Sequence, residues 1–201
     1  MHIDSLEKLR TLYGPAKERA LKKQQSELDV HCRRYIELSP FVVLASSGLD
    51  KKLDASPRGG APGFVKIVDS HTLLLPDSPG NNRLDTLENI IETGRIGMLF
   101  LIPGVDETLR VNGAAELRMD THYLDICQTE VRRPKLVIKI TVQEAYLHCA
   151  KAFMRSKLWD VDSQIERSRL PTMVDMINEQ AAIEGVFETH EEIMRRYRSE
   201  L

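Results

Sequence analysis

Hydrophobic and polar residues alternate in short runs through the middle of this chain and recur at helical spacing towards both ends. Between residues 41 and 148, runs rich in Val, Ile, Leu and Phe are separated by Gly, Pro, Asn and Asp, which is typical of strands joined by hairpins. The pattern predicts six or seven strands, the last of them readable as one long strand or two: 41–45, 53–57, 64–68, 72–75, 96–102, 108–117 and 136–148. Hairpin succession without βαβ alternation predicts an antiparallel sheet, which tends to close into a barrel because closure removes its edges.

Helical spacing flanks the strand region and interrupts it twice. The segments concerned are 4–39, punctuated by Gly14-Pro15, the short stretch 84–91, the stretch 121–130, and the chain from Thr172 onward with a break near Gly185. We therefore expect a mainly β protein with flanking helices, of the α+β class. Its expected parts are a helical arm over 1–39, a barrel over 40–160 and a helical extension over 161–201, forming a single domain overall.

The segment from Thr72 to Gly113 is the strongest candidate for chemistry. A strand leads into a turn rich in Pro, Gly and Asn, and a helix follows, so that unpaired N–H groups and a positive dipole end face the turn. Asn81 or Asn82 is expected to cap this helix, and Arg83 adds a guanidinium that can grip phosphate oxygens. Leu84, Leu87 and Ile91 are expected to share the face that anchors the helix against the core. The alternative is an ordinary capped surface helix with a solvated arginine.

Arg58-Gly59-Gly60-Ala61-Pro62-Gly63 is too rich in glycine and proline for regular structure, so we expect a loop there.

Composition narrows the classes of function. In 201 residues the formal net charge is −2 and aromatic residues make up 5%, which argues against a general affinity for nucleic acid. The basic stretch 132–135 is then a solvated turn rather than a nucleic-acid patch. No run is long enough to span a membrane, and the first residues lack the apolar core of a signal peptide.

Three widely separated cysteines, Cys32, Cys127 and Cys149, argue against a disulfide scaffold and for a reducing compartment, so we expect a cytoplasmic protein. Two of them follow histidines, in the pairs His31-Cys32 and His148-Cys149. Neither pair has the companion residues of a metal site, so no metal is expected.

The order of several short motifs resembles the pyridoxamine 5′-phosphate oxidase-like family of FMN-binding split barrels, and in particular a subgroup of unassigned substrate. The resemblance spans roughly residues 40 to 160 and rests on the segments 41–45, 54–59, 75–90, 97–104, 107–113 and 148–159. It implies an antiparallel split barrel and a homodimer that holds FMN in two equivalent grooves at the subunit interface.

Carried over position by position, the resemblance also implies a set of cofactor-binding residues. Asn82 and Arg83 match the helix start at the FMN phosphate, and Arg58 matches the strand that runs along the flavin, while Thr108 falls near the pyrimidine edge of the ring. Pro76 and Asp77 match the strand end under the ribityl chain of FMN. The remaining matches flank Arg58 or Thr108, or fall on the segment that the partner subunit contributes: Ser56, Pro57, Gly59, Arg110, Lys151, Arg155, Ser156 and Trp159. For Trp159, simple interface packing is the alternative.

The chain also departs from the oxidase that gives the family its name. The substrate-binding arginine and histidine of that enzyme have no counterpart near the C-terminus, so oxidation of a vitamin B6 phosphate is not implied. Two functions stay open. One is an FMN-dependent oxidoreductase acting on a small molecule, with a nicotinamide nucleotide (NADH or NADPH) or oxygen as the other redox partner. The other is a module that stores or senses flavin or haem, in which His148 approaches the flavin or the iron instead of serving as a structural histidine.

Overall fold

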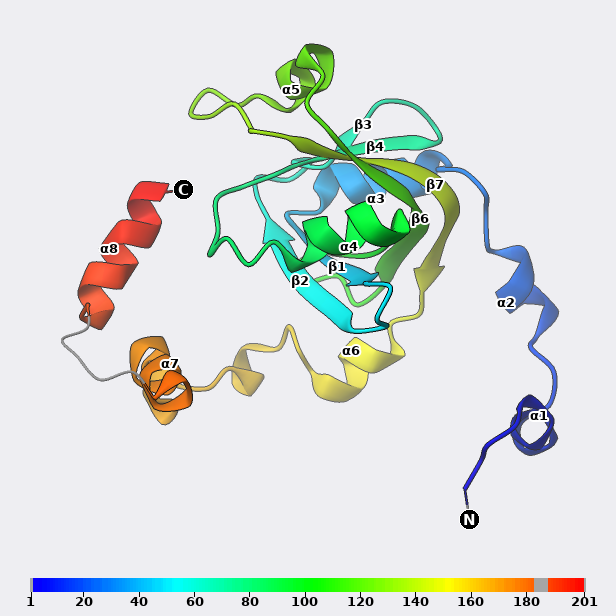
Figure 1. Ribbon diagram of the computed structural model, residues 1–201. Coiled ribbons are helices and arrows are strands. Elements are labelled where there is room, and N and C mark those ends of the chain that lie inside the picture. The colour runs from blue at the N-terminus through cyan, green and yellow to red at the C-terminus, as the bar shows by residue number, and fades with distance from the viewer. Residues whose placement is uncertain (1, 183–187, 201) are drawn as a thin grey trace. The chain divides into compact units, whose positions relative to one another are not determined.

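A seven-stranded antiparallel sheet forms the centre of the computed structural model, with the strand order β2-β1-β5-β6-β7-β4-β3 (Figure 1). The structure describes residues 2–182 and 188–200. The strands are β1 Phe41–Ser47, β2 Leu53–Gly59, β3 Lys66–Ile67, β4 Thr72–Pro76, β5 Arg95–Leu101, β6 Thr108–Arg118 and β7 Val137–His148. Every pairing is antiparallel, so the predicted split barrel is confirmed, with seven strands and with β7 as one long strand.

The main core lies inside the curled sheet. Alternate residues of β1, β5, β6 and β7 point inward, and their side chains are almost completely buried: Val42, Leu44, Met98, Phe100, Leu109, Val111, Ile138 and Ile140. Strict alternation of this kind follows from the twofold side-chain period of a strand. One face of each of these strands is therefore fixed in the core, and the other face points outward.

Strand β4 does not alternate, because both of its faces are covered. Leu73 and Leu75 join the main core, while Leu74 packs with Cys127 and Val137 in a separate small cluster. That cluster is covered by α5 (Thr121–Cys127), which ends three residues before the predicted boundary.

The two ends of the sheet are β2 and β3. Among the described strands, β2 pairs only with β1 and carries Pro57 in its second half, and β3 is two residues long. The predicted loop was wrong at its start: Arg58 and Gly59 extend β2 and pair with Val42 and Phe41. Pairing with a neighbouring strand outweighs the weak strand preference of this sequence.

Helix α4 (Asp85–Thr93) packs on β1 and β6 (Figure 1). Its buried side chains are Thr86, Leu87 and Ile90, whereas Leu84 is 49% exposed and Ile91 is 74% exposed. The predicted anchoring face was therefore right only at Leu87.

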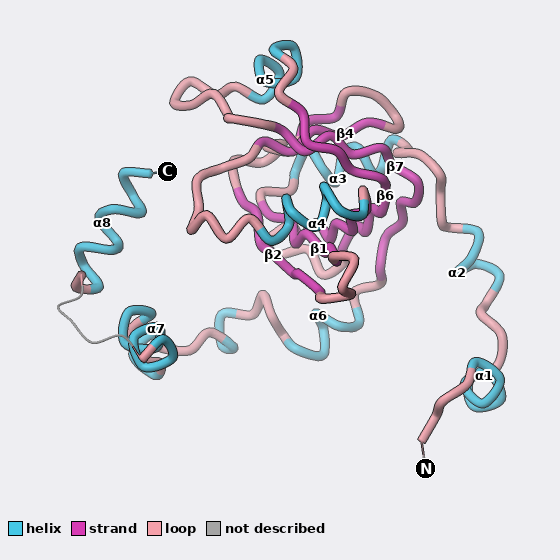
Figure 2. Tube along the Cα trace, in the orientation of Figure 1, coloured by secondary structure: helices cyan, strands magenta, loops and turns pink. Residues whose placement is uncertain are grey.

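An N-terminal arm precedes β1 (Figure 2). It contains α1 (Leu6–Tyr13), α2 (Glu18–Lys22) and α3 (Val30–Leu38), and of these three helices only α3 has buried residues. Asp29 caps α3 by accepting a hydrogen bond from the Cys32 N–H at 2.7 Å, which also holds the Asp29 pKa below its usual value. Cys32, Tyr35 and Ile36 then pack into the main core, so α3 belongs to the barrel.

A second compact unit covers Lys157–Leu201 and follows α6 (Lys151–Ser156). It contains α7 (Met173–Ala181), which begins with a capping box between Thr172 and Asp175, and α8 (His190–Glu200). The predicted break near Gly185 lies outside the described residues. Within the described part, no helix combines the length and the apolar character needed to cross a bilayer.

Candidate cofactor site

Asp54 is the centre of a polar cluster between β2 and α4. Its side chain accepts hydrogen bonds from Thr86 Oγ1, from Ser56 Oγ at 2.7 Å and from Ser46 Oγ at 3.3 Å. Asn89 extends the network by donating to Ser46 Oγ at 3.0 Å. Because Ser46 and Thr86 are buried, these bonds fix β1, β2 and α4 relative to one another.

Arg58 lies at one end of this cluster, next to the start of α4. Its Nη2 donates to Thr86 Oγ1 at 3.4 Å, and its Nη1 donates to the Pro57 carbonyl at 2.9 Å. Burial raises the pKa of Asp77, just beyond β4, and the charges of Arg58 and Lys135 oppose that rise. Two predicted residues, Ser56 and Arg58, thus share the half-buried face of β2 at this cluster, and the Arg58 charge acts on a third, Asp77.

The start of α4 has no side-chain cap among the described residues, which corrects the predicted capping by Asn81 or Asn82. The N-cap residue is Leu84, at a left-handed φ of 60°, and Asn82 is also left-handed at 58°. Asn81 Oδ1 instead accepts from the Arg83 N–H at 3.1 Å and closes a local turn. The positive end of α4 therefore lies open beside Arg58. We refer to this place, formed by Arg58, Thr86 and the start of α4, as the corner.

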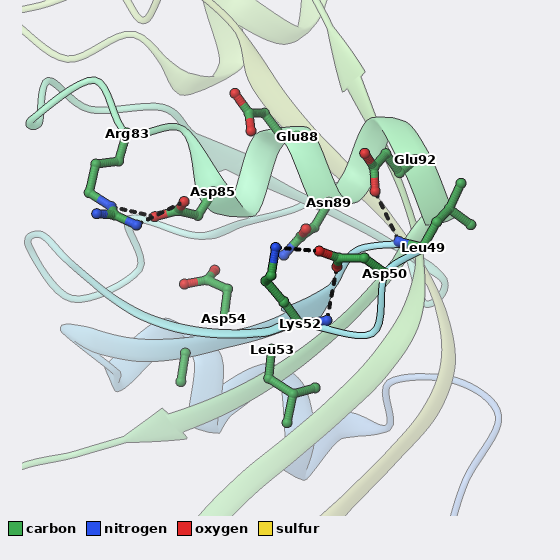
Figure 3. A pocket seen from close by; sticks show the side chains of 11 residues that line it. Leu49, Asp50, Lys52, Leu53, Asp54, Arg83, Asp85, Glu88, Asn89 and Glu92 are labelled. Carbon is green, nitrogen blue, oxygen red and sulfur yellow. Dashed lines mark hydrogen bonds and ion pairs between the residues drawn. The ribbon is translucent and has the colours of Figure 1, made fainter.

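Arg83 does not share this corner as a free cation. Its Nε donates to Asp85 Oδ2 at 2.8 Å and its Nη2 to Asp85 Oδ1 at 3.4 Å, and its side chain is 72% exposed. This bond lowers the pKa of Asp85 and raises that of Arg83 (Figure 3). A phosphate at this position would have to compete with Asp85.

A cavity of about 620 Å³ opens beside the corner, between the β1–β2 hairpin and α4 (Figure 3). Its charged lining is mainly acidic, and the two cations, Lys52 and Arg83, pair with Asp50 and Asp85. The lining acids that form no ion pair with another described residue are Asp54, Glu88 and Glu92, whose Oε2 accepts from the Leu49 N–H at 2.9 Å. The cavity itself is electrostatically unsuited to phosphate, so an anion is better placed at Arg58 and the open end of α4.

The other predicted residues fall in different places. Pro57 and Gly59 point to the opposite face of β2 from Arg58, Pro76 pairs with Val137 at the end of β4, and Thr108 is buried at the start of β6. Arg110 lies on the outward face of β6, where its Nη2 pairs with Glu144 Oε1 at 2.7 Å.

The segment after β7 is separate from Arg58 and from Arg83. Within residues 2–182 and 188–200, no hydrogen bond or ion pair joins Lys151, Arg155 or Ser156 to Arg58 or Arg83, and Ser156 Oγ donates to the Phe153 carbonyl at 3.0 Å. Trp159 is half-buried and belongs to the second unit.

Sequence reasoning missed Asp54 and Thr86, although one signal was present. In a strand, Asp54, Ser56 and Arg58 share a face, and this is the half-buried face of β2. The cysteines and histidines form no metal site in the described residues. Burial raises the pKa of Cys32 to about 12 and that of Cys127 to about 11, which keeps both thiols protonated.

Comparisons with known proteins agree with this architecture. A sequence model of the family described as pyridoxamine 5′-phosphate oxidase matches residues 28–149. Among curated proteins, none matches the chain.

Three solved structures illustrate the structural similarity. A variant of HupZ from Group A Streptococcus is 18% identical with a TM-score of 0.50, over 60% of this chain and 99% of HupZ. A Lactobacillus delbrueckii protein named as a candidate pyridoxamine 5′-phosphate oxidase is 18% identical with a TM-score of 0.47, over 61% of this chain and 95% of that one. HutZ, the heme storage protein from Vibrio cholerae, is 8% identical with a TM-score of 0.40, over 60% and 93%. At these identities the likeness to HupZ shows a shared fold and carries no information on chemistry.

Proposed function

The chain belongs to the pyridoxamine 5′-phosphate oxidase family, and from that premise we propose that it binds FMN as a cytoplasmic homodimer and acts as an FMN-dependent oxidoreductase on a small organic molecule. The observation that carries the proposal is the corner formed by Arg58, Thr86 and the uncapped start of α4. A phosphate dianion needs cations and N–H donors together, and this corner supplies both. The Arg58 charge also acts on Asp77, just beyond β4, and opposes the rise that burial causes in its pKa.

The outward face of the sheet suits a flat ring system. Val43 on β1 pairs with Leu99 on β5, which in turn pairs with Arg110 on β6, and all three side chains are half-buried. Val43 and Leu99 thus form an apolar surface with the polar side chain of Arg110 at its end. Binding sites for small ligands commonly combine an apolar surface with a few polar groups in this way. When bound, FMN would supply two-electron redox chemistry, while the protein would orient it and adjust its electronics.

A second copy of the chain is part of the proposal. Half-buried apolar side chains on the outward face would be covered by a twofold partner, which would also bring the segment from Lys151 to Trp159 to the cofactor. A homodimer detected by sedimentation is expected, and a stable monomer with bound flavin would contradict this part of the proposal.

The decisive test compares FMN with riboflavin, which lacks the phosphate. We expect FMN to bind at least about a hundredfold more tightly than riboflavin, because a charged group that makes two hydrogen bonds to the phosphate contributes roughly 2.7 kcal/mol. Quenching of flavin fluorescence measures both affinities. Equal affinities, or no binding of either flavin, would refute the phosphate corner.

The same preparation separates the enzyme from the storage alternative. Flavin absorption bands favour FMN binding, and a Soret band favours haem. If NADH or NADPH reduces the bound flavin in stopped-flow mixing, turnover is supported. A flavin that neither nucleotide nor a panel of small substrates reduces would favour storage or sensing.

Asp85→Asn is expected to tighten FMN binding about three- to tenfold and to leave riboflavin binding unchanged. The substitution frees Arg83 from its ion pair and removes a negative charge next to the phosphate. Thermal unfolding serves as the control, because an acidic residue in the first turn of α4 also stabilises the helix by about 0.3–1 kcal/mol. Weaker FMN binding in a folded variant would show that Arg83 has no phosphate role.

A further inference from the structure

Tyr146 on β7 is flanked by two cations that come from different parts of the chain. Lys23 Nζ lies 4.9 Å from the centre of the Tyr146 ring, and the guanidinium carbon of Arg110 lies 4.4 Å from it. His148 is next along the same face, with its ring centre 5.1 Å from that of Tyr146. Because Arg110 is the register partner of Tyr146 and Thr108 that of His148, the group is fixed by the β6–β7 ladder.

Lys23 is held in place by backbone pairing rather than by an acidic partner. The Gln25 N–H donates to the Ala145 carbonyl at 3.0 Å, and the Ala145 N–H donates to the Gln25 carbonyl at 2.8 Å. Lys23 Nζ itself donates to the Leu147 carbonyl at 2.6 Å. The arm thus presents an ammonium group whose charge no carboxylate neutralises among the described residues.

Glu144 is the one carboxylate that the described residues bring into hydrogen-bond contact with this cluster, and it already accepts three hydrogen bonds. Its Oε1 accepts from Arg110 at 2.7 Å and from Asn112 at 2.9 Å, and its Oε2 accepts from Gln24 at 2.9 Å. Two cations therefore face one anion. Arg110 Nε is buried, and no partner for it exists in the described part of the chain.

From this arrangement we infer that Lys23 and Arg110, which both lie over the ring of Tyr146 and next to His148, form a binding site for the oxyanion group of a small ligand, a carboxylate or a phosphate. An oxyanion would balance the excess charge of the cluster and accept from Lys23 and from the outer edge of Arg110, whose side chain is 37% exposed.

The site is distinct from the corner at Arg58, which lies on another strand at the other side of β1. Its use as a substrate site beside the flavin rests on the proposed function, since Thr108, the residue predicted near the pyrimidine edge, is opposite His148. Anion binding itself does not depend on flavin, and the two ideas can therefore fail separately.

The pKa of His148 can report whether an anion is bound at this site. Burial, followed by the charges of Arg110 and Lys23, lowers the His148 pKa, so the imidazole is neutral at pH 7. The charged groups that act on it are Arg110 on β6 and Lys23 on the arm, and Glu144 on β7 reaches the cluster through its ion pair with Arg110. A bound anion would offset the two cations and raise the His148 pKa.

The experiment titrates inorganic phosphate, and separately benzoate, into the full-length protein without flavin in a chloride-free buffer, following the His148 ring proton by NMR. We expect saturable shifts and a higher His148 pKa, and the tighter of the two probes identifies phosphate or carboxylate as the preferred group. Lys23→Gln should weaken binding about tenfold, whereas the matched control Lys22→Gln should not, because Lys22 is 75% exposed and pairs with Glu18. Thermal unfolding checks that both variants are folded.

No His148 response to either probe, or equal weakening in the two lysine variants, would overturn the inference. The phosphate titration is then repeated on FMN-loaded protein, which separates this site from the corner at Arg58. A His148 shift that is retained supports two separate sites. A His148 shift that FMN abolishes overturns the inference of a second site. A phosphate response in a protein that binds no FMN would leave the inference standing and refute the proposed function.

Discussion

Gly113→Ala is expected to destabilise the barrel by about 3 kcal/mol, because the added methyl group has no space. A Cβ at this position would lie 2.1 Å from the Thr141 carbonyl oxygen and 3.0 Å from its carbon, both backbone atoms of the paired strand. Gly113 is where the β6–β7 register shifts, so the two strands approach closely there. Relief would require opening the longest ladder of the sheet.

Urea unfolding followed by circular dichroism measures this effect. Gly80→Ala is the matched control, since nothing lies within 4 Å of a Cβ built there and its backbone is not left-handed. We expect the control to unfold within about 0.5 kcal/mol of the parent protein. An unchanged midpoint for Gly113→Ala would show that β6 and β7 can separate at this point at little cost.

Arg58→Ala is expected to weaken FMN binding about a hundredfold and to leave riboflavin binding nearly unchanged. The variant loses a charged group that can make two hydrogen bonds to one phosphate, and a hundredfold corresponds to roughly 2.7 kcal/mol. Stability should change little, because the Arg58 side chain bonds, within the described part of the chain, only to Thr86 and to the carbonyl of its neighbour Pro57. Fluorescence titration with both flavins is the measurement.

Two controls make the Arg58 result specific. Arg95→Ala removes an exposed arginine of β5 outside the corner and should leave the FMN affinity as it was. The Asp77 pKa should rise further in Arg58→Ala, because the arginine charge opposes the effect of burial on that carboxyl. If FMN and riboflavin affinities fell equally, Arg58 would act on the fold and not on the phosphate.

The fold was predictable from local patterns because strand alternation and turn residues carry most of the information. The sheet, its hairpins and the two inserted helices, α4 and α5, all follow from spacing alone. The face of α4 was not predictable from spacing. Thr86 is buried because Asp54 accepts a hydrogen bond from its hydroxyl, and that bond joins residues 32 positions apart.

The candidate sites were likewise not predictable where they depend on contacts between residues far apart in the sequence. Arg58 was identified through a resemblance, but its neighbours Thr86 and Asp77 come from other elements. The site at Tyr146 combines the arm with β6 and β7, and the Gln25–Ala145 bridge, with the bonds of Lys23 and Gln24 to β7, holds the arm there. Pairings between residues so far apart along the chain leave no periodic trace in the sequence.

The two outermost strands constrain how copies of this protein can assemble. Strand β2 contains Pro57, which has no backbone N–H, and strand β3 (Lys66–Ile67) is only two residues long. Both features disfavour extension into a continuous intermolecular sheet. They favour pairing of two copies through side chains on the faces of the barrel, where specificity is set by shape rather than by main-chain complementarity.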